Sequence, residues 1–379
     1  MSYTRAQIEA LGDYHGSVPV PEDFDAFWAA RMAEADAQPL EWELADAREA
    51  AGGADLSPAA VSGAPCKLFD LWFRGMGGAR LHAKYLAPTG ELALAQTPEG
   101  EPFCGVPLVL QFHGYPGTSR SWLEQMSYVG MGMAILAFDC PGQGGPGVDV
   151  GGYEGTTVAG HIVAGLDGDP AGLYYVRCHQ DIRILCRIVR ELEGVDLGRV
   201  YVNGASQGGG LGIACAALNA DLVSRAAILY PFLSDYRRVF ELEADDIAYE
   251  GLRYYARWFD PAGIRTDEVF GKLTYIDSAS FAHLVRAEVL FGTGLADIVC
   301  PPPTQCAVYN NLTCPKRRVL FPDFGHEEIQ AFDDMIIDFF NVGLGAWQSE
   351  DARESGAAGA AVALGSAGSE VVRGGVVHE

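Results

Sequence analysis

The feature of this 379-residue chain that most restricts its fold is an alternation of short apolar runs with segments of helical pattern. Beyond residue 106 the apolar runs read PLVLQFHG, MAILAFD, RVYVNG, AAILYP, AEVLFGTG and RRVLFP. Continuous apolar runs are typical of strands buried on both faces, and helices between them imply parallel crossovers. Before these runs, FDLWFRG and ARLHAKYLAP predict a β-hairpin with its turn at residues 75–78. We therefore predict an α/β fold with a doubly wound, mostly parallel sheet that begins with an antiparallel hairpin.

The remaining segments predict one domain with a tail. PEDFDAFWAARMAEAD, residues 21–36, has the pattern of a capped amphipathic helix. Residues 232–281 interrupt the alternation with aromatic residues at helical spacing, which predicts a helical insertion over the carboxyl edge of the sheet. We interpret these aromatics as the insertion's own core in preference to a substrate-binding cluster. We expect a single domain over residues 1–348, and a poorly ordered, low-complexity tail over 349–379.

Composition and charge exclude several classes of partner. The chain has 50 acidic and 26 basic residues and a net charge of −24, which repels nucleic acids and anionic membranes. Its longest apolar stretch, GMGMAILAF, is too short to span a bilayer. Nine cysteines show no metal-type spacing with histidine, and the N-terminus lacks the apolar core of a signal peptide. We expect a soluble, cytoplasmic protein with reduced thiols and no bound metal.

Gly204-Ala205-Ser206-Gln207-Gly208 is the motif with the clearest chemical meaning. It matches G-x-S-x-G and stands between the strand-like RVYVN and a helical segment rich in small residues. In α/β-hydrolases this strand–turn–helix unit presents a serine nucleophile, and glycines relieve the crowding of the tight turn. The helix N-terminus also favours negative charge that develops beside the serine. We predict an α/β-hydrolase fold in which Ser206 is the nucleophile.

A serine hydroxyl needs a base to remove its proton, and the base needs a third group to orient it. In this fold the partners follow in the order Ser, Asp, His. His326 follows the last predicted strand, and Asp297 follows the strand before it, so we predict these two as base and acid. Asp323 and Asp235 are alternative acids; a loop-capping role suits Asp323 better, because the orienting acid should come from a different strand end.

An oxyanion hole requires two backbone amides near the nucleophile. One should belong to Gln207, the residue after the serine, and the other to the loop that follows PLVLQF. In that loop we choose the Tyr115 amide, because Pro116 has none. His113, at the end of the same strand, could be mistaken for the base, but its place favours a scaffolding role.

These residues resemble a known family. QFHGY, GASQGG, GLADIVCPPPTQCAVYN and FPDFGHE are similar to the acetyl xylan esterase/cephalosporin C deacetylase family, carbohydrate esterase family 7, over residues 21–347. The resemblance implies that Ser206, Asp297 and His326 are catalytic and that the Tyr115 and Gln207 amides form the oxyanion hole. It further implies hydrolysis of short acyl esters, chiefly acetyl groups on sugars, with no metal or other cofactor. It also implies a hexamer whose active sites face an inner chamber.

One position departs from the family pattern. The family has an Arg-Gly-Gln element where this chain reads Pro141-Gly142-Gln143. Because the family arginine braces the site, its absence bears on loop packing and substrate range. Acetylated xylooligosaccharides, cephalosporin C-like compounds and other acetyl esters are all open as substrates. The alternative functions are a serine peptidase, a short-chain carboxylesterase and a non-catalytic binding protein of the same fold.

Overall fold

The structure, a computed structural model, describes residues 2–47, 66–95, 102–244 and 247–344. Residues 46–66 and 95–104 are rich in Ala, Gly, Pro and Glu, which predicts surface loops. Most of these two segments, and the whole tail predicted at 349–379, lie outside the described residues. Within the described residues nine strands form one sheet: β1 (Trp42–Asp46), β2 (Cys66–Arg74), β3 (Arg80–Pro88), β4 (Val106–Phe112), β5 (Ala134–Phe138), β6 (Val195–Ala205), β7 (Val223–Leu229), β8 (Glu288–Gly294) and β9 (Lys316–Phe321).

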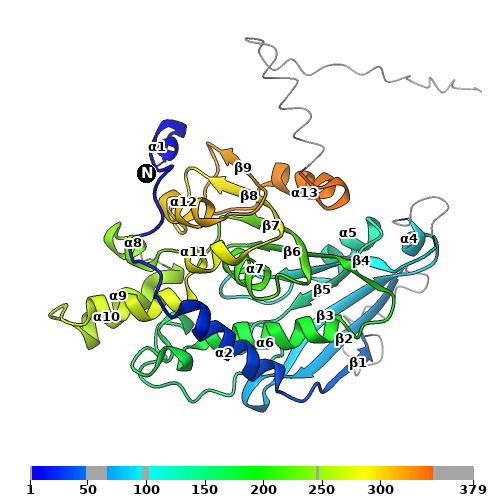
Figure 1. Ribbon diagram of the computed structural model, residues 1–379, viewed down its shortest axis with the longest axis horizontal. Coiled ribbons are helices and arrows are strands. Elements are labelled where there is room, and N and C mark those ends of the chain that lie inside the picture. The colour runs from blue at the N-terminus through cyan, green and yellow to red at the C-terminus, as the bar shows by residue number, and fades with distance from the viewer. Residues whose placement is uncertain (1, 48–65, 96–101, 245–246, 345–379) are drawn as a thin grey trace, which may run out of the picture.

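The strands lie in the order β1-β2-β3-β5-β4-β6-β7-β8-β9 (Figure 1). Neighbouring strands from β1 to β5 are antiparallel, and those from β5 to β9 are parallel. The predicted strands, the hairpin and the mostly parallel sheet are confirmed. Sequence reasoning missed β1, a short edge strand that pairs with β2 and is only partly buried. Its weak apolar pattern follows from that half-exposed place at the edge.

Helices cover both faces of the sheet. The helices within the described residues are α1 (Arg5–Glu9), α2 (Phe24–Asp36), α4 (Gly90–Leu94), α5 (Trp122–Gly130), α6 (Tyr174–Val189), α7 (Gln207–Leu218), α8 (Tyr236–Glu241), α9 (Glu250–Phe259), α10 (Thr266–Leu273), α11 (Ser278–Phe281), α12 (Pro302–Asn311) and α13 (Gln330–Val342). Figure 1 shows α2 and α6 on one side of the sheet and α5 and α13 on the other. The protein has two main hydrophobic cores, and alternate residues of the central strand β4 enter them. Leu110 packs in one core with residues of α6 and α7, whereas Val109 packs in the other with residues of α5 and α13. None of the described helices has the length and hydropathy to cross a membrane.

The helix predicted at residues 21–36 is α2, and it buries Phe24 and Trp28. The indole N–H of Trp28 donates to the carbonyl of Tyr275, 2.9 Å away. The expectation of a capped start is wrong, since Asp23 makes no side-chain bond to the helix. Its carboxylate instead accepts a 2.6 Å hydrogen bond from the Tyr275 hydroxyl, which fastens α2 to the helical insertion.

The insertion predicted at 232–281 begins just beyond the carboxyl end of β7 and contains α8 to α11. Its buried aromatic rings pack on one another, as Phe232 and Tyr249 do at 4.4 Å between centroids, so they do form a core. The insertion also contacts the long segment after β5, where the Tyr255 hydroxyl donates to Asp167 at 2.5 Å. These contacts place it against the loops at the carboxyl edge.

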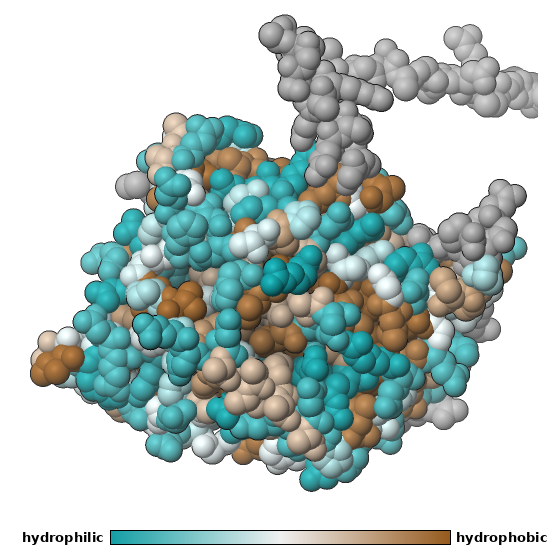
Figure 2. Space-filling model, in the orientation of Figure 1, coloured by the Kyte–Doolittle hydropathy of each residue, from teal (hydrophilic) through white to brown (hydrophobic). Residues whose placement is uncertain are grey.

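The surface of the molecule seen in Figure 2 is mostly hydrophilic, with smaller hydrophobic patches.

A buried histidine joins the hairpin to the loops at this edge. His82 on β3 lies between two carboxylates, 2.6 Å from Asp139 and 2.8 Å from Asp70. Asp139 follows β5, and its other oxygen accepts bonds from the Ser119 amide and the Thr118 hydroxyl. Burial alone would lower the pKa of His82, but its bonds to the two carboxylates outweigh burial and raise that pKa. Because a carboxylate oxygen faces each ring nitrogen, both nitrogens are placed to donate, which favours the protonated imidazole. His82 thereby holds three segments together.

We expect the His82→Gln variant to lose about 3 kcal/mol of stability near pH 6, because it leaves buried Asp139 without its cation. A raised folded-state pKa means that the protonated histidine stabilises the fold fully below its unfolded pKa. This contribution is lost as the pH rises through the folded pKa. The difference between wild type and variant in urea unfolding should therefore be smaller at an alkaline pH, above the folded-state pKa of His82, than near pH 6. An equal difference at both pH values would contradict the buried cation.

Candidate active site

Ser206 occupies the sharp turn between β6 and α7. Its backbone has φ +58° and ψ −123°, a conformation that residues other than glycine rarely adopt. The neighbouring chain holds this turn, because the Ser206 amide donates to Leu229 and its carbonyl accepts from Phe232. Glycine is required beside it: a Cβ on Gly208 would lie 2.0 Å from the carbonyl oxygen of Phe112. The turn thus has the strand–turn–helix form expected of G-x-S-x-G.

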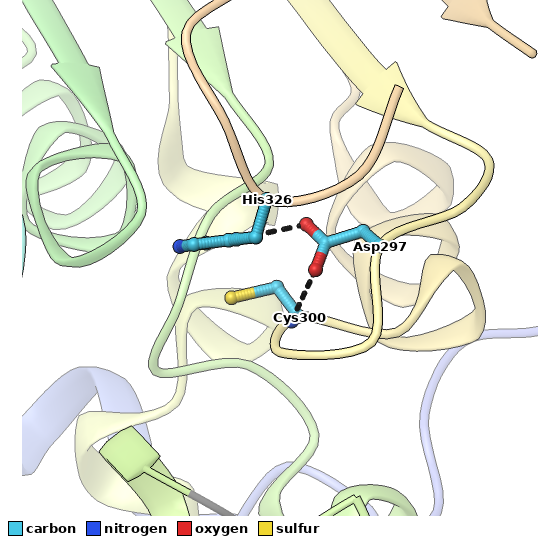
Figure 3. A group of neighbouring side chains, drawn as sticks. All are labelled: Asp297, Cys300 and His326. Carbon is cyan, nitrogen blue, oxygen red and sulfur yellow. Dashed lines mark hydrogen bonds and ion pairs between the residues drawn. The ribbon is translucent and has the colours of Figure 1, made fainter. Parts of the chain in front are cut away.

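The structure brings the three predicted triad residues into one hydrogen-bonded line. His326 Nε2 lies 2.9 Å from Ser206 Oγ, and His326 Nδ1 lies 2.9 Å from Asp297 Oδ2. Asp297 is buried, and its other oxygen accepts the amides of Val299 and Cys300 at 2.9 and 2.8 Å. Figure 3 shows the histidine ring beside this carboxylate. The His326 side chain remains 21% exposed, so the imidazole reaches solvent while the Asp297 carboxylate is enclosed.

The alternative candidates lie elsewhere. Asp235 accepts hydrogen bonds from the Tyr14 hydroxyl at 2.5 Å and the Ser17 amide at 3.0 Å, and so anchors the N-terminal segment. Asp323 lies exposed in the turn after β9, and within the described chain no hydrogen bond connects it to His326. His113 joins two loops, because its Nδ1 donates to the Gly114 carbonyl and its Nε2 accepts the Cys140 amide. That arrangement fits the scaffolding role predicted for it.

The two predicted oxyanion amides belong to segments that lie beside the serine. Gln207 opens α7, and the Tyr115 loop is close enough that a Cβ on Gly114 would lie 3.9 Å from the Ser206 Cβ. Neither the Tyr115 amide nor the Gln207 amide donates a hydrogen bond to any atom of the described residues. Unused donors beside a nucleophile are available to an oxygen of a bound substrate.

A polar network that sequence reasoning did not foresee holds Gln207. Its side-chain amide pairs reciprocally with that of Gln143, at 2.9 and 3.0 Å, and also accepts from the Tyr175 hydroxyl at 2.8 Å. Pro141, which replaces the family arginine, contributes its carbonyl, an acceptor for the Tyr174 hydroxyl at 2.7 Å. The segment after β5 is therefore braced through backbone and amide groups. In the sequence, the one indication of this polar network was the Gly142-Gln143 pair.

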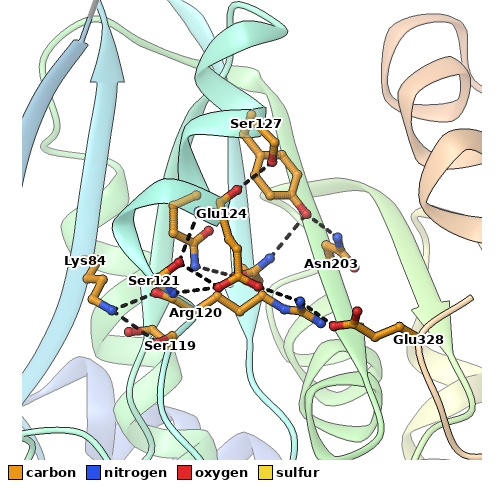
Figure 4. Close-up of polar contacts among 11 residues, drawn as sticks. Lys84, Ser119, Arg120, Ser121, Glu124, Ser127, Asn203 and Glu328 are labelled. Carbon is orange, nitrogen blue, oxygen red and sulfur yellow. Dashed lines mark hydrogen bonds and ion pairs between the residues drawn. The ribbon is translucent and has the colours of Figure 1, made fainter. Parts of the chain in front are cut away.

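The loops that carry Tyr115 and His326 are also linked to each other. Arg120 donates to Glu328 at 2.7 Å and to Glu124 at 3.0 Å (Figure 4). On the other side of this loop, the Lys84 ammonium donates to the carbonyls of Ser119 and Arg120. The Arg120–Glu328 pair is largely exposed, so it contributes about 1 kcal/mol at most and serves mainly to align the loops.

Cys300 is a further residue at the site that the sequence analysis did not identify as functional. Its side chain is buried next to Asp297 and His326 (Figure 3). Burial and the Asp297 carboxylate raise the pKa of this thiol, and a hydrogen bond with Ser206 opposes them. A cysteine inside an apolar run gives no signal of such a neighbourhood, because cysteine is also a common small core residue.

Comparison with known proteins agrees with this geometry. The family model described as acetyl xylan esterase (AXE1) matches residues 1–342. The solved structure of acetyl xylan esterase 1 from Thermoanaerobacterium sp. JW/SL YS485 is 37% identical and has a TM-score of 0.79, covering 90% of this chain and 99% of that one. The acetyl xylan esterase from Paenibacillus sp. R4 is 30% identical with a TM-score of 0.78, covering 89% and 99%.

A curated relative, the acetyl esterase Axe7A of Xylanibacter ruminicola, is 27% identical over 319 residues. The match covers 80% of this chain but only 62% of that longer protein. Because the family model matches most of the chain and the Thermoanaerobacterium structure aligns along nearly its whole length, the chain belongs to the acetyl xylan esterase (AXE1) family.

Proposed function

We propose that this protein is a serine esterase that removes acetyl and other short acyl groups from their esters. The observation that carries the proposal is the unbroken hydrogen-bonded line from Ser206 through His326 to Asp297. Family membership supports the same reaction class, since the relatives are named as acetyl xylan and acetyl esterases. We propose Ser206 as nucleophile, His326 as base and Asp297 as the acid that orients it.

The reaction proceeds by two acyl transfers. His326 Nε2 takes the proton of Ser206 as its oxygen attacks the ester carbonyl, and Asp297 stabilises the imidazolium through Nδ1–H. The Tyr115 and Gln207 amides receive the oxyanion, each contributing about 3 kcal/mol. His326 then gives its proton to the leaving alcohol. The same histidine activates a water molecule, which releases the carboxylic acid and restores the serine.

The Ser206→Ala variant should lose roughly a million-fold in kcat on p-nitrophenyl acetate, since it removes the oxygen that forms the acyl-enzyme. A fluorophosphonate probe should label the wild type and fail to label this variant. Ser127→Ala, the same substitution on an exposed face of α5, serves as the matched control and should keep wild-type turnover. Near-normal hydrolysis by Ser206→Ala would remove the basis of the esterase proposal.

The proposed substrates are acetylated sugars, with xylooligosaccharides first and cephalosporin C-like acetyl esters second. A panel of these compounds, read as acetate release, should rank them. On p-nitrophenyl esters the rate should fall as the acyl chain grows from acetyl to octanoyl. A preference for long chains would favour a lipase-like carboxylesterase, and cleavage of peptide amides at comparable rates would favour the peptidase alternative.

We also propose that the protein acts in the cytoplasm as a homo-oligomer, a hexamer by family resemblance. Large apolar side chains exposed near the α9–α10 connection support self-association: Trp258 is 62% exposed and Ile264 is 85% exposed. Sedimentation velocity should report a species about six times the 40.5 kDa chain mass. A monomer at micromolar concentration would contradict the hexamer.

A further inference from the structure

Cys300 belongs to the same turn as the proposed catalytic acid. Its amide donates to Asp297 Oδ1 at 2.8 Å, a bond that closes the turn after β8. This local bond fixes the direction of the cysteine side chain, and Figure 3 shows the sulfur on the same side of the turn as the histidine ring. The side chain has no exposed surface of its own. The thiol is therefore held in place beside the base.

Together the three side chains offer a set of metal ligands. One atom each from Asp297, Cys300 and His326, an oxygen, a sulfur and a nitrogen, lie within 4.8 Å of one another. Small shifts of side chains would bring such atoms onto one ion at the usual lengths of about 2.0–2.3 Å. Among the described residues, no other group of three histidine, cysteine, aspartate or glutamate side chains meets this spacing.

The chemistry of the donors selects the class of ion. Thiolate and imidazole ligands favour borderline-soft divalent cations such as Zn²⁺ and Cd²⁺ over Mg²⁺ and Ca²⁺, which require oxygen. Cys186 and Cys215 provide a contrast: their sulfurs lie 3.9 Å apart in the core, and no histidine or carboxylate among the described residues completes a group of three ligands with them.

We propose that Cys300, His326 and Asp297 form an inhibitory site for Zn²⁺-class cations inside the esterase centre. On binding, the Cys300 thiol releases its proton to solvent and its sulfur bonds the cation, with no change of oxidation state. The imidazole donates a lone pair to the same cation. His326 can then no longer accept the Ser206 proton. The loss of turnover rests on the proposed function, whereas cation binding does not.

The route for the cation is the opening that serves the ester. The His326 side chain is 21% exposed and Ser206 is 9% exposed, while Asp297 and Cys300 lie beneath them. A cation must therefore pass through the space that the substrate fills. Inhibition should accordingly compete with substrate and be reversed by a chelator.

The test uses Zn²⁺ for inhibition and Cd²⁺ for binding, because cadmium–thiolate bonds absorb in the ultraviolet. Wild type should show a cadmium–thiolate band and competitive Zn²⁺ inhibition of p-nitrophenyl acetate hydrolysis, relieved by EDTA. Cys300→Ser should reduce this band and raise the Zn²⁺ inhibition constant at least about tenfold. Inhibition of each variant is measured relative to that variant's own rate without metal. Cys104→Ser, which removes an exposed thiol, is the control and should keep the wild-type inhibition constant.

Cys300→Ala is the second variant, used if Cys300→Ser does not fold. A wild-type enzyme without the band, or a folded Cys300 variant inhibited by Zn²⁺ as strongly as wild type, would overturn the proposal. Ser206→Ala separates the two inferences, since it keeps all three ligands and should retain the cadmium band. Ester hydrolysis by Ser206→Ala at the wild-type rate would refute Ser206 as the nucleophile and leave the binding result to stand by itself.

Discussion

The close approach of α7 to strand β4 is the constraint on which the site depends. Gly208 in the first turn of α7 lies so near the Phe112 carbonyl that no side chain fits between them. This approach sets the helix N-terminus directly behind Ser206 and forces the serine into its positive φ. The hydroxyl then projects from the carboxyl edge of the sheet, and the Gln207 amide has no hydrogen-bond partner among the described residues. One steric requirement thus positions both the proposed nucleophile and a proposed donor for the oxyanion.

Buried polar contacts hold the surrounding loops. Protonated His82 binds the carboxylate of Asp139, which in turn accepts the backbone of the loop that carries Tyr115. Gln143 and Tyr175 fix the side chain of Gln207 from the other side. In a low-dielectric interior a buried polar group is stable when its hydrogen bonds are made and costs free energy when one is broken. These bonds therefore favour one arrangement of the loops. Because they use backbone and amide groups, they brace the site with proline at position 141.

The proposed base and acid, His326 and Asp297, are also potential metal ligands. Whether they can bind a metal ion depends on which other ligand lies beside them. Here the neighbour is a thiol held in place by the same turn that orients the acid. The local geometry that makes Asp297 an effective partner for His326 therefore also completes a soft-metal donor set. The proposed sensitivity to such cations follows from the short spacing between Asp297 and Cys300.

The sequence by itself determined the strands other than β1, the hairpin, the helical insertion and the three residues of the hydrogen-bonded line. Strand runs and the G-x-S-x-G turn are local patterns, and chain order in parallel sheets assigns each following loop to the same edge. Only the tertiary structure decided what surrounds that line: the His82 cation, the Gln143–Gln207 pair, the Arg120–Glu328 link and the thiol of Cys300. The first three are contacts between residues on different segments of the chain, and the orientation of the thiol depends on a single turn. The physical reason is that periodicity reports which face a residue takes, whereas side-chain contacts depend on packing that no local pattern encodes.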